Sequence, residues 1–301
     1  MSKITTALIP IGGFGTRFFP QTRAFPKEML PLVDKPVIQY IVENLVTAGI
    51  KHIIFATNSH KGIIENHFDL PNMDIIYSLE NNKNKKKILS KLEKIATMAR
   101  FSYVRDRGPR GTAAPIYSAE HLLSIEEGFI YTTADDLILA FPNEFEQLVE
   151  AYNTCKSNYM ACIESKDEID YERYAFIKGK LLNDNQIKIG GIVYKPGREN
   201  APSKLAAISS CLFTKDIISY VNIAAKSYKK NSDFSLAKII QDMINDNKSI
   251  IGLKIMDGNF IDVGNKLDYL KALVHFGAND DEISAEFTDW LIKYKNIKTS
   301  K

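Results

Sequence analysis

The chain has 301 residues, 45% of them hydrophobic, which is enough apolar surface for one large α/β domain or two modest ones. Its 39 basic and 36 acidic side chains give a net charge of +3, which argues against a nucleic-acid-binding or membrane-surface protein. No apolar run approaches the roughly 18 residues that cross a bilayer, and no signal-peptide core follows Met1. We therefore expect a soluble, cytoplasmic protein that meets a charged ligand through a local cluster of cations.

The three cysteines are odd in number and have no CxxC spacing, so they indicate neither a disulfide framework nor a metal site. They are Cys155, Cys162 and Cys211. We expect all three to be buried thiols in a reducing compartment.

The first predicted element is a buried strand at residues 7–10, a short apolar run that passes directly into Gly12-Gly13-Phe14-Gly15-Thr16-Arg17. Glycines at a strand exit let the backbone turn sharply and bring its N–H groups close to an anion, which a Cβ would obstruct. Basic residues follow at Arg17, Arg23 and Lys27, on a proline-rich connector rather than a long helix. This pattern is typical of phosphate binding.

Two common phosphate-binding motifs do not fit this stretch. The P-loop needs Gly-Lys-Ser/Thr at the start of a helix, and the dinucleotide fingerprint needs G-x-G-x-x-G with an acidic residue about 20 positions later. Here Arg17 follows the glycines, and two prolines within the next ten residues exclude an immediate long helix.

The next elements place this glycine loop at a sheet edge. Residues 37–48 predict an amphipathic helix that ends at Gly49, and residues 52–57 predict a second buried strand. A strand, a helix and a strand in about fifty residues imply a right-handed crossover and a parallel pair. The loop then lies at the carboxyl end of the first strand, where open α/β sheets bind ligands.

The remaining pattern predicts an α/β fold with a mixed, mostly parallel central sheet flanked by helices. In chain order we expect a lysine-rich solvated helix within residues 81–99, a strand at 101–104, helices at 113–123 and 144–155, and strands at 128–133 and 159–163. Strands at 174–177, 191–193 and 206–213 lack a helix between each, which predicts a partly antiparallel portion. Helices at 215–225 and 235–246, one opened by residues 260–266, and an amphipathic helix at 283–294 complete the chain.

Two adjacent carboxylates end the predicted strand at 128–133. They are Asp135 and Asp136 in Ala134-Asp135-Asp136. Such a pair is often only a turn, but in a phosphate-binding protein the carboxylates become candidate metal ligands.

The string G-x-G-T-R and the run Pro-Lys-Glu-Met-Leu-Pro-Leu-Val-Asp-Lys-Pro at residues 26–36, with Gln39-Tyr40 beyond, resemble the signature of the bacterial UTP–glucose-1-phosphate uridylyltransferases. These are sugar-1-phosphate nucleotidyltransferases. The resemblance spans roughly the whole chain and is dense at residues 5–69 and 260–276. It implies a Rossmann-like nucleotidyltransferase fold in a single domain, residues 1–301, with a nucleotide-binding half up to about residue 140 and a sugar-binding half with the C-terminal helices beyond it.

The resemblance also implies a role for each matching residue. The residues that match the loop wrapping the nucleotide are Gly12, Gly13, Gly15 and Thr16. Arg17 and Lys27 match the cations that stabilise the departing pyrophosphate and the reacting phosphate, and Lys195 matches the lysine that grips the sugar phosphate. Asp135 and Asp262 match the two aspartates that hold Mg²⁺.

The chemistry that this set implies is UDP-glucose and pyrophosphate formation from UTP and glucose 1-phosphate, by in-line attack on the α-phosphate. The second pKa of a phosphate monoester is about 6, so the nucleophile is an anion near neutrality and needs no general base. Fixed cations and one divalent metal must hold two polyanions together, and Mg²⁺ accepts one or two carboxylates. We also expect a homo-oligomer, since the terminal helix has an apolar face that docks on its own subunit or on a neighbour.

Several positions depart from the family pattern. Asp106 stands where a glutamine reads the uracil edge, and Gly111 with a basic neighbour is what remains of the second glycine-rich loop. On the sugar side, Ala175 replaces a glycine, Tyr194 replaces a glutamate before Lys195, and Lys204 replaces an asparagine. The same chemistry with another base or sugar 1-phosphate, and a weakly active or regulatory paralogue, therefore stay open as alternatives.

Overall fold

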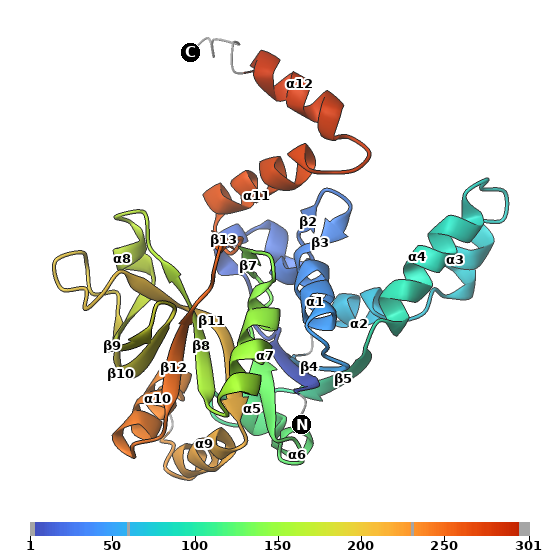
Figure 1. Cartoon of the computed structure of the whole chain (residues 1–301). Coiled ribbons are helices and arrows are strands. Elements are labelled where there is room, and N and C mark those ends of the chain that lie inside the picture. The colour runs from blue at the N-terminus through green and yellow to red at the C-terminus, as the bar shows by residue number, and fades with distance from the viewer. Residues whose placement is uncertain (1–3, 59–60, 230–231, 295–301) are drawn as a thin grey trace.

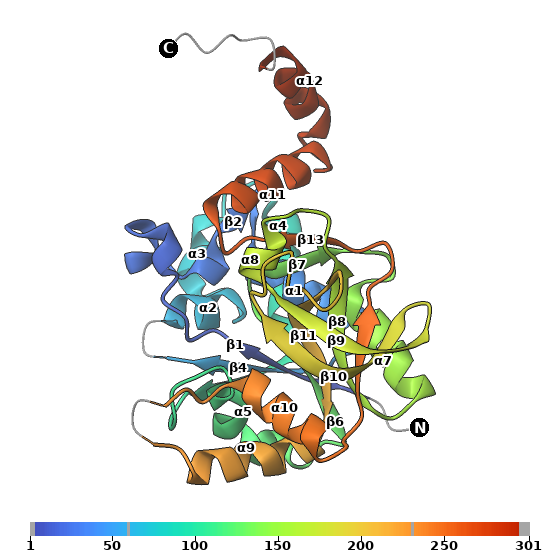
Figure 2. The same cartoon turned by 90° about the vertical axis from the view of Figure 1, so that its left-hand side faces the viewer.

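The computed structural model describes residues 4–58, 61–229 and 232–294. A nine-stranded sheet runs through the centre, with helices on both faces (Figures 1 and 2). Its strands, in order across the sheet, are β5 (Arg100–Arg105), β4 (His52–Thr57), β1 (Thr6–Pro10), β6 (Gly128–Tyr131), β11 (Leu205–Thr214), β8 (Asn158–Glu164), β12 (Ile250–Lys254), β10 (Gln186–Tyr194) and β9 (Ala175–Asn183). Among these described strands β10 and β11 run against all the others, which confirms the mixed, mostly parallel sheet.

Strand β1 lies in the interior of the sheet, between two parallel neighbours. Leu8 is in register with Ile54 of β4 on one side and with Tyr131 of β6 on the other. Alternate side chains enter opposite cores, with Ala7 and Ile9 in one and Leu8 in the other. The apolar run is continuous because both faces of the strand are covered.

Helices cover both faces of the sheet (Figure 2). The core on the Ile9 side contains residues of α1 (Val37–Thr47) and α7 (Glu144–Thr154). The core on the Leu8 side contains residues of α5 (Ala114–Ser118), α6 (Glu120–Leu123), α9 (Asp216–Lys226) and α10 (Leu236–Asn245). Gly49 follows the end of α1 with a left-handed φ of 91°, as the sequence predicts for a helix stop.

The remaining elements lie at the edges of this body (Figure 1). They are α2 (Gly62–His67), α3 (Met73–Ser78), α4 (Lys85–Thr97), α8 (Asp170–Arg173), α11 (Lys266–Ala278), α12 (Ser284–Tyr294), the pair β2 (Pro31–Leu32) and β3 (Lys35–Pro36), and the pair β7 (Asp136–Leu139) and β13 (Asn259–Asp262). Three 3₁₀ turns, Thr16–Phe18, Gln21–Arg23 and Lys27–Met29, follow the glycine loop, as expected where prolines prevent a long helix.

The structure corrects several predicted elements. The helix expected at residues 113–123 is two short helices, because Ala119 leaves helical geometry between them. The short β-strands expected at 174–177 and 191–193 are a long hairpin, β9 and β10, because β9 is exposed beyond Ile177 and two glycines interrupt the apolar pattern of β10. The strands β7, β12 and β13 and the helix α3 were not predicted, since each is short and the strands pair with distant segments.

The cysteines are free, and Cys162 and Cys211 are buried as expected. Cys155 is exposed, contrary to the prediction, because it follows the last turn of α7 at the surface. Among the helices that the structure describes, we find none whose length and apolar character would let it cross a membrane.

Candidate active site

The glycine loop leaves β1 and turns at Gly15, which has a left-handed φ of 63°. A Cβ at Gly15 would lie 3.0 Å from Lys27 Cβ, so a side chain there would be strained and crowded. The Thr22 hydroxyl donates a hydrogen bond of 2.6 Å to the Gly15 carbonyl oxygen. These contacts pack the loop directly against the connector that carries the predicted cations.

Residues that no motif had indicated hold the loop from the β4 side. The Asn58 side-chain amide donates a hydrogen bond of 2.6 Å to the Gly12 carbonyl oxygen. Lys61 Nζ donates to the Gly13 carbonyl oxygen at 2.8 Å and to Glu28 Oε2 at 2.7 Å. From the sequence alone, Lys61 and Glu28 would be expected at the surface. Their pairing could not be predicted, because the two residues are separated by 33 positions and no local pattern indicates a buried ion pair.

A cleft of about 650 Å³ opens beside the loop. We call it the central cleft and define it by the predicted residues that line it, namely Gly15, Thr16, Arg17, Lys27, Asp135, Lys195 and Asp262. Segments from both halves of the chain therefore meet at one place. The cleft is also lined by Asp136 and by residues that the sequence did not indicate, namely Thr133, Glu172, Arg173, Tyr174 and Ser209.

The carboxylates of Asp135 and Asp262 converge in this cleft. The antiparallel pair β7–β13 places Asp262 opposite Asp136, and the Val263 N–H donates to the Asp135 carbonyl oxygen at 3.2 Å. A Cβ on Gly264 would lie 2.8 Å from both Asp135 Oδ2 and Asp262 Oδ1, so these oxygens are within twice that distance of each other. Asp262 Oδ1 also accepts a hydrogen bond of 2.9 Å from the Gly264 N–H, and two carboxylates that meet beside Gly264 fit a hard divalent cation that completes its shell with water and phosphate.

The charges around this point are tightly coupled. Lys27 Nζ lies 2.5 Å from Asp135 Oδ2, and Arg17 Nη1 lies 3.8 Å from the Cβ position of Gly264. Burial opposes the charge of Lys27, but the Asp135 carboxylate outweighs it and the pKa of Lys27 is raised. Burial, and then the neighbouring Asp135, raise the pKa of Asp136 to about 7. In the described residues no group of three or more His, Cys, Asp or Glu side chains could hold a metal, so a cation here would rely on these two aspartates and its other ligands.

Asp106 and Gly111 lie outside the lining of the central cleft. Asp106 follows β5, accepts a hydrogen bond of 3.0 Å from the Ser118 hydroxyl, and has Oδ2 3.8 Å from the Cβ position of Gly12. Asp106 therefore faces the first glycine of the loop, and burial raises its pKa. A Cβ at Gly111 would overlap the backbone of Phe234, so this glycine allows two loops to pack closely.

The predicted sugar-side residues separate into two groups. Lys195 lines the central cleft in a left-handed conformation with φ of 48°, and its N–H donates to the Tyr174 carbonyl oxygen at 3.0 Å. Ala175 and Tyr194 pair at the base of the β9–β10 hairpin and are not part of the cleft lining, and Tyr194 is 70% exposed. Their contact with a sugar stays a prediction.

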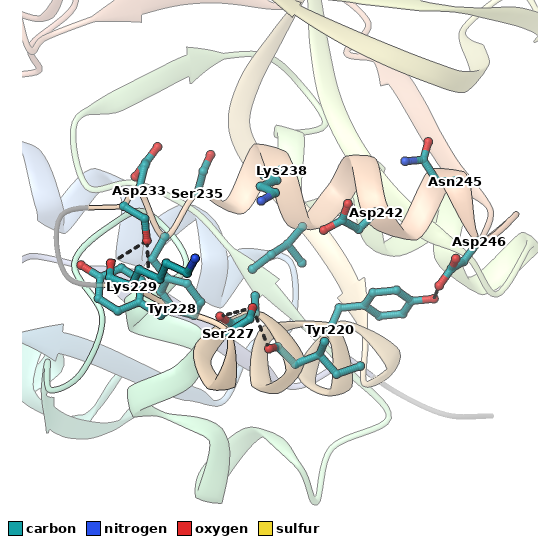
Figure 3. A pocket seen from close by; sticks show the side chains of 15 residues that line it. Tyr220, Ser227, Tyr228, Lys229, Asp233, Ser235, Lys238, Asp242, Asn245 and Asp246 are labelled. Atoms are coloured by element: carbon teal, nitrogen blue, oxygen red, sulfur yellow. Dashed lines mark hydrogen bonds between the residues drawn. The ribbon is translucent and has the colours of Figure 1, made fainter.

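A second hollow, of about 570 Å³, lies between α9 and α10 (Figure 3). Its labelled side chains mix both charges, with Lys229 and Lys238 beside Asp233, Asp242 and Asp246. It contains none of the predicted site residues and does not match a polyanion. The central cleft is therefore the candidate active site.

Comparison with known proteins gives one family. The nucleotidyl transferase family model matches residues 6–278. A UTP–glucose-1-phosphate uridylyltransferase 2 of Staphylococcus saprophyticus is 33% identical over 295 residues, which cover 98% of this chain and 99% of the relative. A UTP–glucose-1-phosphate uridylyltransferase of Staphylococcus epidermidis is 32% identical over 286 residues, 95% of this chain and 96% of the relative.

Solved structures give the same picture. A UDP-glucose pyrophosphorylase complexed with UDP-glucose has 31% identity and a TM-score of 0.78, covering 91% of this chain and 98% of that one. A UTP-bound UGPase from Acinetobacter baumannii has 27% identity and a TM-score of 0.83, covering 96% of this chain and 99% of that one.

Proposed function

Because the chain belongs to the nucleotidyl transferase family, we propose that it forms UDP-glucose and pyrophosphate from UTP and glucose 1-phosphate. The relatives named for this activity match nearly the whole chain, and solved structures similar to it carry UTP or UDP-glucose. The nine-stranded sheet takes strands from both halves of the sequence, which supports one nucleotidyltransferase domain over residues 1–301.

The observation that carries this proposal is the convergence of distant charges on one cleft. Asp135 precedes β7 and Asp262 ends β13, the two strands of a small sheet, yet an oxygen of each lies 2.8 Å from the same Cβ position on Gly264. Lys27 and Arg17 from the N-terminal connector flank that point, and Lys195 from the hairpin lines the same cleft. Fixed cations beside a carboxylate pair are what phosphoryl transfer between polyanions requires.

In the proposed mechanism the chain's residues bind and orient rather than exchange protons. The sugar phosphate is already an anion near neutral pH, so no base is needed for its attack on the α-phosphorus. Arg17 and Lys27 bind the phosphates and stabilise the pyrophosphate as it leaves, while Lys195 orients the sugar phosphate. We propose that Asp135 and Asp262 hold Mg²⁺, which when bound neutralises phosphate charge.

The glycine loop completes this mechanism by contacting the nucleotide through its backbone. Gly12, Gly13, Gly15 and Thr16 would supply N–H donors for phosphate oxygens, a role in which a side chain is a hindrance. Asp106, which faces Gly12, would accept a hydrogen bond from the base. A carboxylate cannot donate to the base carbonyls, so another base is the second candidate substrate.

We also propose a homo-oligomer. None of the described residues of α12 is buried, although its face carries Trp290 and Ile292, which are 52% and 62% exposed. Figure 1 shows α12 projecting away from the sheet beyond α11. Sedimentation of the full chain and of a Trp290→Lys variant tests this: a monomeric wild type would contradict it.

The function is tested by pyrophosphate release from the four common nucleoside triphosphates with a panel of sugar 1-phosphates and Mg²⁺. We expect the highest kcat/KM for UTP with glucose 1-phosphate. A higher value for another nucleotide and sugar phosphate would reassign the substrates. If the folded protein turns over no pair, the result would favour a regulatory paralogue. Arg17→Ala should lower the rate by about 10²- to 10³-fold, the usual loss of one charge-stabilising donor. Arg100→Ala is the matched control, because Arg100 is exposed at the start of β5, at the opposite end of the sheet from the glycine loop.

A further inference from the structure

The backbone of the glycine loop is rich in unused donors. Within the described parts of the chain, the N–H groups of residues 12–15 donate no hydrogen bond to another protein group. These residues are partly or fully exposed, so water can serve their N–H groups in the free protein, and successive N–H groups in a turn are a surface that an anion can bind in place of that water. Such donors are useful only if the loop keeps them pointing in a fixed direction.

The carbonyl oxygens of the same loop are held from one side. Asn58 binds the Gly12 oxygen and Lys61 binds the Gly13 oxygen. In a trans peptide the C=O and N–H groups of one unit point in opposite directions. Fixing these two oxygens therefore directs the N–H groups of Gly13 and Phe14 away from Asn58 and Lys61, and it prevents either peptide from rotating.

Lys61 is buried where it makes this contact. Its side chain is 4% exposed, and that of its partner Glu28 is 1% exposed. Burying a lysine is costly unless its charge is paired and its N–H groups donate hydrogen bonds. Here Glu28 pairs the charge, and the Gly13 carbonyl oxygen accepts a further hydrogen bond. Glu28 is adjacent to Lys27, which pairs with Asp135, so Lys61 joins the glycine loop to the connector that reaches the carboxylate pair.

We propose that Lys61 is a positioning residue for nucleotide binding, which fixes the glycine loop through the Gly13 carbonyl oxygen while Glu28 balances its charge. The proposal rests on the proposed function, since it assigns the loop donors to the triphosphate. A purely structural role predicts that Lys61 matters only as the charge partner of Glu28. The two roles give opposite results when both charges are removed together.

The test compares wild type, Lys61→Met and the double variant Lys61→Met/Glu28→Gln. Lys61→Met leaves the Glu28 carboxylate buried without its partner, so the melting temperature should fall. The double variant removes both charges and should regain most of that loss. Its Kd for UTP with Mg²⁺, measured by calorimetry without sugar phosphate, should still be weaker by about 10- to 100-fold, because the loop is no longer fixed.

Two further readouts separate positioning from general damage. Tryptic cleavage after the exposed Arg17 in the ligand-free protein should be faster in the double variant, and the KM for UTP should rise while the KM for glucose 1-phosphate changes little. Lys91→Met is the matched control, because Lys91 forms an exposed pair with Asp34 far from the loop and should change none of these values. A double variant with wild-type UTP affinity or wild-type cleavage after Arg17 overturns the proposal.

These experiments separate a wrong role for Lys61 from a wrong proposed function. If the wild type neither binds UTP nor releases pyrophosphate, the function is wrong. Tryptic cleavage after Arg17 in the ligand-free protein still reports whether Lys61 holds the loop in that case. If the wild type binds UTP and the double variant binds it equally well, the function stands and the role of Lys61 is wrong.

Discussion

Glu144 gives a prediction whose size follows from the structure. It is the first residue of α7, its side chain is fully buried, and neither carboxylate oxygen has a hydrogen-bond partner among the described residues. Burial raises the pKa of Glu144 from its ordinary value of 4.5 to about 8. The helix N-terminus favours a negative charge, but the loss of hydration is the larger effect.

The sign and size of the pH effect follow from linkage. The folded protein holds Glu144 neutral, and the stability that this gives is fully present below pH 4.5 and is lost as pH rises toward about 8. Each pKa unit corresponds to about 1.4 kcal/mol, so the largest loss of unfolding free energy at pH 8 is about 4 kcal/mol. Glu144→Gln is neutral at every pH and should match the wild type near pH 4.5 and exceed it by about 2–4 kcal/mol at pH 8.

The assay is urea unfolding followed by circular dichroism at intervals from pH 4.5 to 8.5. Glu150→Gln is the control, because Glu150 is exposed on the same helix and its substitution should give a curve parallel to that of the wild type. A constant difference between Glu144→Gln and wild type across this range would refute the reasoning. It would mean that the carboxylate of Glu144 is hydrated or partnered when ionised.

Two predictions concern the site itself. Gly264→Ala places a methyl group 2.8 Å from oxygens of both Asp135 and Asp262, so the variant should fold but lose its Mg²⁺ dependence and about 10²-fold or more of its rate. Gly190→Ala is the control and should keep both, because the nearest atom to its Cβ position is 3.7 Å away. An unchanged Mg²⁺ titration of Gly264→Ala would mean that the metal does not bind beside Gly264. Asp106→Asn gains a donor for a uracil carbonyl and keeps an acceptor for N3–H, so the ratio of kcat/KM for UTP over CTP should rise about 10-fold in parallel assays, and a constant ratio would mean that Asp106 does not contact the base.

The strand–loop part of the site was predictable because its signals are local. The apolar run before the loop can be buried only as a short strand, and glycine at position 15 has a conformation that other residues avoid. Prolines after the loop exclude a helix, and the structure has short 3₁₀ turns there. The order of these residues therefore carries most of the information needed to place Arg17 and Lys27.

The metal pair was identified by resemblance but its geometry was not predictable. Asp135 and Asp262 meet because β7 and β13 pair antiparallel, and each strand has four residues. A strand of that length has no distinguishing periodicity, and its register depends on a partner more than a hundred residues away. The same is true of Arg173, Tyr174 and Ser209, which reach the cleft through the long hairpin and the middle of the sheet.

Lys61 and Glu28 show the clearest limit. Sequence favours solvent for both residues, since lysine and glutamate are rarely buried. Only the fold brings them together under the loop, where each makes the burial of the other tolerable. The sequence by itself determined the loop, its cations and the α/β class through nearest-neighbour preferences of the backbone. Which charges face one another, and across what distance, was decided by long-range strand pairing and core packing, because electrostatic interactions depend on position in space and not on position in the chain.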